Sequence, residues 1–188
     1  MSDLRCRPVT PDRWDDLVAL FGDNGAYDGC WCMYQRVTSR EYSEGRGEGN
    51  RQKLHELVTE GREPGLLAYD GDTPVGWVSA GPRPDYGRIL RSPLFRPDDP
   101  DDASTWSVAC FYLPREHRGR GLTDVLLRGA VDRAREVGAH TIEGYAIAPD
   151  GRPAAELYVG VPAVFERADF EEVGAPSEIR RLYRRSLT

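Results

Sequence analysis

The sequence predicts a mixed α/β fold in which a sheet of six or seven strands is flanked by helices. Two observations lead to this prediction. Strand-like and helix-like segments alternate along the 188 residues, and a glycine-rich loop separates the clearest strand from the clearest helix. The length suits a single domain with a sizeable core, and no internal repeat or long low-complexity linker divides the chain. We therefore expect one domain that covers residues 1–188.

The composition predicts a cytoplasmic protein without a nucleic-acid or membrane partner. A formal net charge of -6 disfavours sequence-independent binding to nucleic acids and anionic membranes, which select basic surfaces. No stretch approaches the roughly 18 apolar residues of a membrane span, and the first residues lack the basic and apolar regions of a secretory signal. Four cysteines are too few for a disulfide scaffold, so we expect reduced thiols.

The N-terminal part of the chain predicts a strand at 4–9, two helices and a hairpin. The first helix follows that strand directly. Asn50 is expected to cap the second helix, which ends near Gly61. The segment 65–79 has the signal of a hairpin, because two apolar runs enclose a turn of Asp, Gly and Pro. Residues 22–49, between the two helices, give no clear pattern.

The middle of the chain is the most legible part. Residues 82–103 are rich in Pro, Asp and Arg and predict a long surface excursion, a feature that is often functional. A buried strand is expected at 106–113 and a loop at 114–121. A helix is expected from 122 to 137, because its apolar residues fall on one face, and the next strand at 140–147.

The C-terminal third predicts a helix that leads to Phe165, followed by strands at 170–173 and 179–183. Arginines are concentrated at the end of the chain, namely Arg180, Arg181, Arg184 and Arg185. Charged residues on a last strand typically protect the edge of a sheet, and this is our interpretation of the set. The alternative is contact with a phosphate group.

The loop Arg118–Thr123 carries the strongest functional signal, because it connects a predicted strand to a predicted helix. The start of a helix presents unpaired N–H groups and the positive end of the helix dipole, which together bind phosphate. Gly119 and Gly121 have no Cβ, so the backbone can approach a ligand closely. Arg118 and Arg120 add guanidinium groups suited to a pyrophosphate. We therefore predict a pyrophosphate site.

Two other phosphate-binding motifs fit this loop less well. A P-loop has Lys-Ser/Thr after its glycines, and that pair is missing from the sequence of the loop. The dinucleotide fingerprint has a third small residue where Asp124 stands, and it usually opens the first βα unit.

The sequence resembles the GCN5-related N-acetyltransferase (GNAT) superfamily. The signature of that family, Gln/Arg-x-x-Gly-x-Gly/Ala, is similar to Arg118-x-x-Gly121-x-Thr123, between a strand and a helix. Residues 165–170 are similar to the family's closing helix-to-strand signature, and the likeness extends over about residues 65–185. The resemblance implies a mostly antiparallel sheet whose fourth and fifth strands splay apart.

The resemblance also implies that acetyl-CoA is the co-substrate and that no metal takes part. The pantetheine arm is expected to pair with the backbone of the fourth strand, and the pyrophosphate to meet the glycine-arginine loop. The implied cofactor-binding residues are Phe111, Tyr112, Leu113, Arg118, Gly119, Arg120, Gly121, Leu122 and Thr123.

The catalytic residues are less clearly implied, because the sequence departs from the family pattern. Thr123 and Asp169 replace small residues, and Phe165 stands where many members have a tyrosine that acts as general acid. Tyr158, just upstream, is the first substitute for the acid, with Tyr145 and Cys110 as alternatives. Glu143 is the candidate general base, because strand alternation directs it to the same face as Tyr145.

We therefore expect transfer of an acetyl group to the primary amine of a small molecule, by direct attack of the amine on the thioester. Acetylation of a protein N-terminus or lysine is one alternative. A non-catalytic acyl-CoA-binding module is another, since Phe165 cannot donate a proton. Dimers are common in the family, so a homodimer stays open. Cys30 and Cys32 have no paired zinc ligands in the sequence, and we interpret them as buried packing near the substrate entrance.

Overall fold

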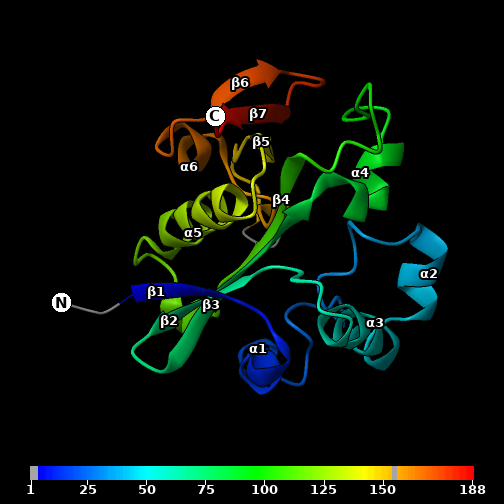
Figure 1. The fold of residues 1–188 in the computed structure, drawn as a ribbon, viewed down its shortest axis with the longest axis vertical. Helices are drawn as coiled ribbons and strands as arrows, with labels where there is room; N and C mark the ends of the chain where they lie inside the picture. Colours follow the sequence, from blue (N-terminus) through cyan, green and yellow to red (C-terminus); the bar gives the residue numbers. More distant parts are fainter. Residues whose placement is uncertain (1–3, 154–155) are drawn as a thin grey trace.

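The computed structural model describes residues 4–153 and 156–188. Its centre is a seven-stranded sheet with the order β1-β2-β3-β4-β5-β7-β6 (Figure 1). Strands β4 and β5 run parallel, and the other neighbouring strands are antiparallel. The predicted mixed α/β fold, with helices flanking a mostly antiparallel sheet, is confirmed.

The predicted elements agree with those of the structure to within a few residues. The strands are β1 (Leu4–Pro8), β2 (Leu66–Asp70), β3 (Thr73–Pro82), β4 (Thr105–Tyr112), β5 (Thr141–Ile147), β6 (Glu171–Gly174) and β7 (Arg180–Ser186). The helices are α1 (Trp14–Phe21), α2 (Ser39–Glu44), α3 (Glu48–Thr59), α4 (Gly87–Arg91), α5 (Leu122–Glu136) and α6 (Pro162–Glu166). Short 3₁₀ turns are η1 (Pro11–Arg13), η2 (Arg83–Asp85) and η3 (Arg115–His117). In the described chain, each helix is too short or too polar to span a membrane.

The two larger hydrophobic cores of the described residues lie on opposite faces of the sheet. Helix α5 packs across β1 to β4 and buries Leu126, Leu127 and Ala130 completely. Helices α1 and α3 cover the other face, where Leu17 and Leu54 are fully buried. The apolar stripe predicted for α5 therefore faces the sheet, and this packing fixes the position of the loop that precedes the helix.

Strands β4 and β5 splay apart toward their C-terminal ends. Their parallel pairing ends at Val108 and Gly144, although β4 continues to Tyr112 and β5 to Ile147. Backbone groups beyond the last pair are therefore available to another segment or to a ligand.

The segment that the sequence left unclear, residues 22–49, contains α2. Thr38 caps this helix through a capping box with Glu41. Asn50 does not cap α3, contrary to the prediction. The helix begins at Glu48, after Gly47 with φ of 80°, and Asn50 is buried inside it, where its side-chain amide donates to the carbonyl of Gly29.

Two predictions about exposure are wrong. The excursion at 82–103 is not a surface loop throughout, because it contains α4 and because Tyr86 and Arg83 are buried. Strand β7 is not an edge strand, because β6 pairs with its outer side. In both cases long-range contacts bury residues whose composition is typical of surfaces.

Candidate active site

The glycine-arginine loop has the geometry of an anion site. Gly121 is the N-cap of α5 with φ of 72°, and Gly119 has φ of 74°. Both conformations are in the left-handed region that favours glycine. A Cβ at either position would meet no atom within 4 Å, so open space lies in front of the first N–H groups of α5. The loop can therefore receive a phosphate group against its backbone.

A cavity of about 930 Å³ runs from this loop along the splayed end of β4. Its wall includes six of the predicted cofactor-binding residues, namely Phe111, Tyr112, Leu113, Arg118, Gly119 and Thr123. Arg115 joins them and was missed in the sequence, where its position next to the glycine loop was the available signal. The shape suits a long ligand whose charged end rests on α5.

The other three predicted residues are not part of the cavity wall. Arg120 forms an ion pair with Asp70 on β2 at 2.8 Å, which turns its guanidinium away. The Leu122 side chain is buried in the core under α5, so only its backbone faces the loop. Gly121 has no side chain to line the cavity and instead sets the direction of the helix start.

The segment 157–161 enters the gap between β4 and β5. The N–H of Phe111 donates to the carbonyl of Tyr158 at 2.6 Å, and the N–H of Ile147 donates to the carbonyl of Gly160 at 3.0 Å. The sequence led us to expect that an extended ligand pairs with the backbone of β4. The N–H of Phe111 is not available for this pairing, because it already donates to Tyr158. These two bonds also fix Tyr158 at the opening of the splay.

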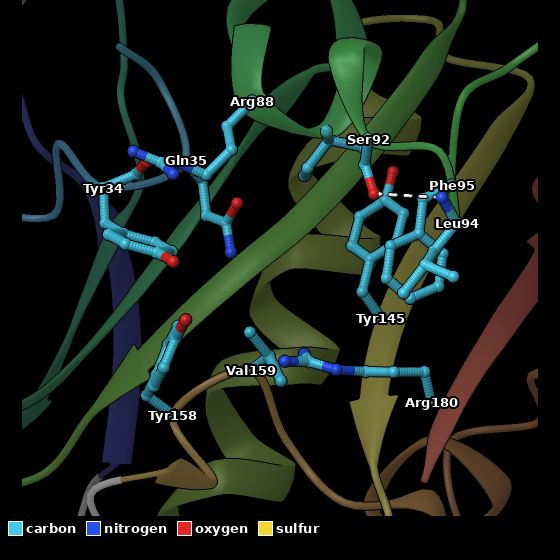
Figure 2. A pocket seen from close by; sticks show the side chains of 11 residues that line it. Tyr34, Gln35, Arg88, Ser92, Leu94, Phe95, Tyr145, Tyr158, Val159 and Arg180 are labelled. Carbon is cyan, nitrogen blue, oxygen red and sulfur yellow. Dashed lines mark hydrogen bonds between the residues drawn. The ribbon is translucent and has the colours of Figure 1, made fainter. Parts of the chain in front are cut away.

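A second, smaller cavity of about 160 Å³ adjoins the large one (Figure 2). Three residues, Tyr34, Gln35 and Tyr158, line both cavities, so the two spaces meet at the Tyr158 ring. The remaining wall residues come from α4 and the segment after it, from β5, from the segment 157–161 and from β7, namely Arg88, Ile89, Ser92, Leu94, Phe95, Tyr145, Val159 and Arg180. The sequence gave no signal for this assembly, because its parts are far apart along the chain.

Tyr158, the predicted general acid, lines both cavities. Burial, reinforced by Tyr34 and Cys110, raises the pKa of its phenol well above the ordinary value of 10.0, although Arg180 acts in the opposite direction. The phenol therefore keeps its proton at neutral pH and can donate it. The ring lies edge-on to Tyr34, with their centroids 6.2 Å apart.

Phe165 is in the core and is not part of either cavity wall, so its position would not suit a proton donor. It is fully buried and stacks on Tyr183, with centroids 5.5 Å apart. A Cβ on Gly144 would lie 2.0 Å from its ring, so the glycine makes room for it. Phenylalanine fits this apolar environment without an unsatisfied hydroxyl group.

Glu143, the predicted base, is buried in an ion-pair network outside both cavity walls. Arg184 donates to one of its oxygens at 2.6 Å, and Arg83 donates to the other at 3.3 Å. Tyr145 donates to the second oxygen at 3.3 Å and is itself 2.8 Å from the Ser107 hydroxyl. These partners saturate the carboxylate and connect β5 to the excursion at 82–103.

Three of the four cysteines, Cys30, Cys32 and Cys110, line the large cavity. The Sγ atoms of Cys32 and Cys110 are 3.6 Å apart, and the indole N–H of Trp77 donates to Cys32 at 3.0 Å. These hydrogen bonds lower the pKa of the Cys32 thiol, whereas burial raises that of Cys30 to about 11. In the described ranges of the chain, no cluster of His, Cys, Asp and Glu has the arrangement of a metal site.

Comparisons with known proteins agree with this geometry. A sequence model described as the acetyltransferase (GNAT) family matches residues 31–160. A comparison with curated protein sequences finds no match.

Solved structures with the same fold are acetyltransferases. An N-acetyltransferase from Staphylococcus aureus Mu50 aligns with a TM-score of 0.60 and 15% identity, covering 100% of both chains. The paia N-acetyltransferase of Thermoplasma acidophilum, solved with coenzyme A, has a TM-score of 0.57 and 12% identity, covering 98% of this chain and 99% of that one. The ribosomal-protein-alanine N-acetyltransferase of Brucella melitensis has a TM-score of 0.53 and 18% identity, covering 97% and 99%. At these identities the likeness shows the fold alone.

Proposed function

The chain belongs to the GNAT family of acetyltransferases, and on that premise we propose that it transfers an acetyl group from acetyl-CoA to the primary amine of a small molecule. One observation carries the proposal. A continuous cavity joins the anion site at the start of α5 to the splayed end of β4, where Tyr158 lies. A cavity of this kind can hold an elongated, charged acyl donor such as acetyl-CoA and can place its sulfur near the Tyr158 phenol as a proton donor.

The residues around the large cavity fit acetyl-CoA. Gly119, Thr123 and the backbone at the start of α5 suit the pyrophosphate, and Arg115 and Arg118 add positive charge beside it. The splayed part of β4, with Phe111, suits the pantetheine arm. When bound, acetyl-CoA supplies a thioester carbon that a neutral amine can attack directly.

Tyr158 acts as the general acid in this proposal. The phenol is protonated at neutral pH and donates its proton to the departing sulfur as the C–S bond breaks. The described wall residues include no carboxylate or histidine, so the amine loses its proton to water rather than to a protein base. Glu143 instead holds Arg83 and Tyr145, and so acts as a positioning residue.

The size of the small cavity, about 160 Å³, favours a small molecule over a protein chain as the acceptor. Arg88 on α4 donates to the Tyr34 carbonyl at 2.6 Å and to the Ser39 hydroxyl at 3.0 Å, which holds the excursion over the cavity. An extended peptide would need a larger space than this cavity offers. Acetylation of a protein N-terminus or lysine is therefore our second proposal, and a non-catalytic acyl-CoA-binding module is our third.

Calorimetric titration with acetyl-CoA, followed by a thiol-release assay over a panel of amines, tests the function. We expect saturable binding and release of CoA that depends on the amine. N-terminal peptides and lysine peptides in the same panel test the protein acceptor. Binding without CoA release from any acceptor would support the non-catalytic module. The absence of binding at millimolar acetyl-CoA would refute all three.

A further inference from the structure

Arg180, the first residue of β7, extends its guanidinium into the small cavity toward Val159 and Tyr158 (Figure 2). Its side chain forms no hydrogen bond or ion pair with the described part of the chain; its backbone groups alone are bonded. The guanidinium is near enough to Tyr158 to oppose the rise of that residue's pKa. A partly buried positive charge therefore faces a cavity beside the proposed proton donor.

The neighbouring arginines of β7 show that pairing is the norm on this strand. Each has a carboxylate partner, namely Arg181 with Glu172 at 3.6 Å, Arg184 with Glu143 at 2.6 Å and Arg185 with Asp169 at 3.7 Å. The whole chain has 31 acidic residues against 25 Lys and Arg. A guanidinium that lacks a carboxylate partner among the described residues, in a concave site of such an acidic protein, is free to bind an anionic ligand, because no internal ion pair has to be broken first.

The charged residues in the described walls of both cavities are all arginines. Their described residues include arginines and no aspartate or glutamate. In the small cavity Arg88 adds a second positive charge, with its guanidinium 4.1 Å from the centre of the Tyr34 ring. The other residues of this wall are uncharged, and they include Gln35, Ser92, three tyrosines and several apolar side chains. This surface repels a polycation and attracts an anion.

We propose that the acceptor is a small amine that also carries a carboxylate, an amino acid in the chemical sense, and that Arg180 binds this carboxylate. A guanidinium and a carboxylate form two parallel hydrogen bonds, which fix orientation as well as charge. With the carboxylate at Arg180, the amine lies on the Tyr158 side, where the two cavities meet. The apolar residues of α4 and its following segment are left to contact the side chain of the substrate. This inference rests on the proposed acetyl transfer.

The test compares L-alanine, L-leucine and L-phenylalanine, each with its own carboxamide, as acceptors in the thiol-release assay. The carboxamide group has nearly the same shape as the carboxylate but carries no charge. The amino group of the carboxamide is also neutral in a larger fraction of molecules at pH 7, which favours its reaction. A preference for the acid would therefore arise from binding of the carboxylate. We expect kcat/KM to favour each acid by about 10- to 100-fold, the range for one charged hydrogen-bonded pair. Arg180→Gln is expected to remove this preference through KM, and Arg180→Lys to keep part of it.

Arg185→Gln is the matched control, because it removes an arginine from the same strand whose partner is Asp169, outside the cavity. We expect it to keep the preference. Equal use of acids and carboxamides by the unaltered protein, or an unchanged preference in Arg180→Gln, would overturn the proposal. Calorimetry with acetyl-CoA on the same variants should show unchanged affinity.

Direct binding keeps the proposal testable if the acetyl transfer itself fails. Ligand-detected NMR with the same acids and carboxamides, in the presence of CoA, reports on the cavity without turnover. Binding of the acids that is lost in Arg180→Gln would support the carboxylate site even if no CoA is released. The absence of binding by any acid to the unaltered protein would refute it.

Discussion

The two ends of the site are built in different ways. The proposed phosphate end comes from one continuous segment, residues 118–123, where backbone N–H groups at the start of α5 are expected to bind the phosphate. The acceptor end collects single side chains from distant parts of the chain, such as Tyr34, Tyr158 and Arg180. The comparison teaches that the first end depends on backbone conformation, whereas the second depends on the identity of a few side chains.

The sharpest way to break this comparison is a side chain at the phosphate end. Gly121→Glu adds a strained left-handed residue and a negative charge where phosphate is expected, so we predict that calorimetry detects no acetyl-CoA binding. Gly138→Glu is the matched control, since Gly138 follows the other end of α5, has φ of 80° and faces open space. Unchanged affinity in folded Gly121→Glu would refute the phosphate site.

At the acceptor end, Tyr158→Phe removes the proposed proton donor and keeps the ring. We expect kcat to fall by about 100-fold, the lower range for loss of a general acid, while affinity for acetyl-CoA stays the same. Tyr34→Phe is the control, because Tyr34 also lines both cavities. It should lower kcat by less than about 10-fold, within the loss of a neutral hydrogen bond. A larger loss in Tyr34→Phe would transfer the role to that residue.

Glu143 supports the acceptor end through Tyr145, which lines the small cavity, but Glu143 itself is not part of the cavity wall. Glu143→Gln leaves Arg83, which is 7% exposed in its side chain, with a weaker partner. We expect urea denaturation to show a loss of about 2–3 kcal/mol in the free energy of unfolding, below the full range for breaking a buried pair because Arg184 is half-exposed. Glu44→Gln, in an exposed pair with Arg40, should change it by less than about 1 kcal/mol. Unchanged stability with a large loss of kcat would instead support Glu143 as a base.

The pH profile gives the smallest and most specific effect. The pKa of Tyr158 is raised, so its protonated form persists above the ordinary value of 10.0 and the donor is present over the whole neutral range. We therefore expect kcat to rise with pH as more amine becomes neutral, with no fall below about pH 10 from loss of the donor. A fall near pH 9 that disappears in Tyr158→Phe would contradict the raised pKa.

Much of the fold could be predicted because its signals are local. The apolar stripe of α5, the hairpin of β2 and β3 and the glycine loop are each encoded in consecutive residues. The errors occurred where long-range contacts override composition. The sequence predicted that Arg83 and Tyr86 lie at the surface, but both are buried. Arg83 pairs with Glu143, and Arg36 donates to the Tyr86 hydroxyl.

In the candidate site, too, the residues with local sequence signals were predicted, and those that depend on long-range contacts were not. Arg118, Gly119 and Thr123 were predicted from their spacing and line the large cavity. Arg180 was grouped with three other arginines as edge protection, because the sequence does not reveal that β6 covers the outer side of β7. Arg120 was grouped with Arg118, although its ion pair with Asp70 depends on the position of β2.

By itself the sequence determined the strands, the helices α1, α3, α5 and α6 and the glycine loop that we propose binds phosphate, because backbone conformation and dipole direction follow from residues that are close along the chain. Only the tertiary structure decided which charges are paired. Glu143 meets two arginines, whereas Arg180 meets none of the described carboxylates, because pairing depends on the register of β5, β7 and β6. That register leaves the Arg180 guanidinium facing the small cavity. Our proposal for the acceptor depends on this charge.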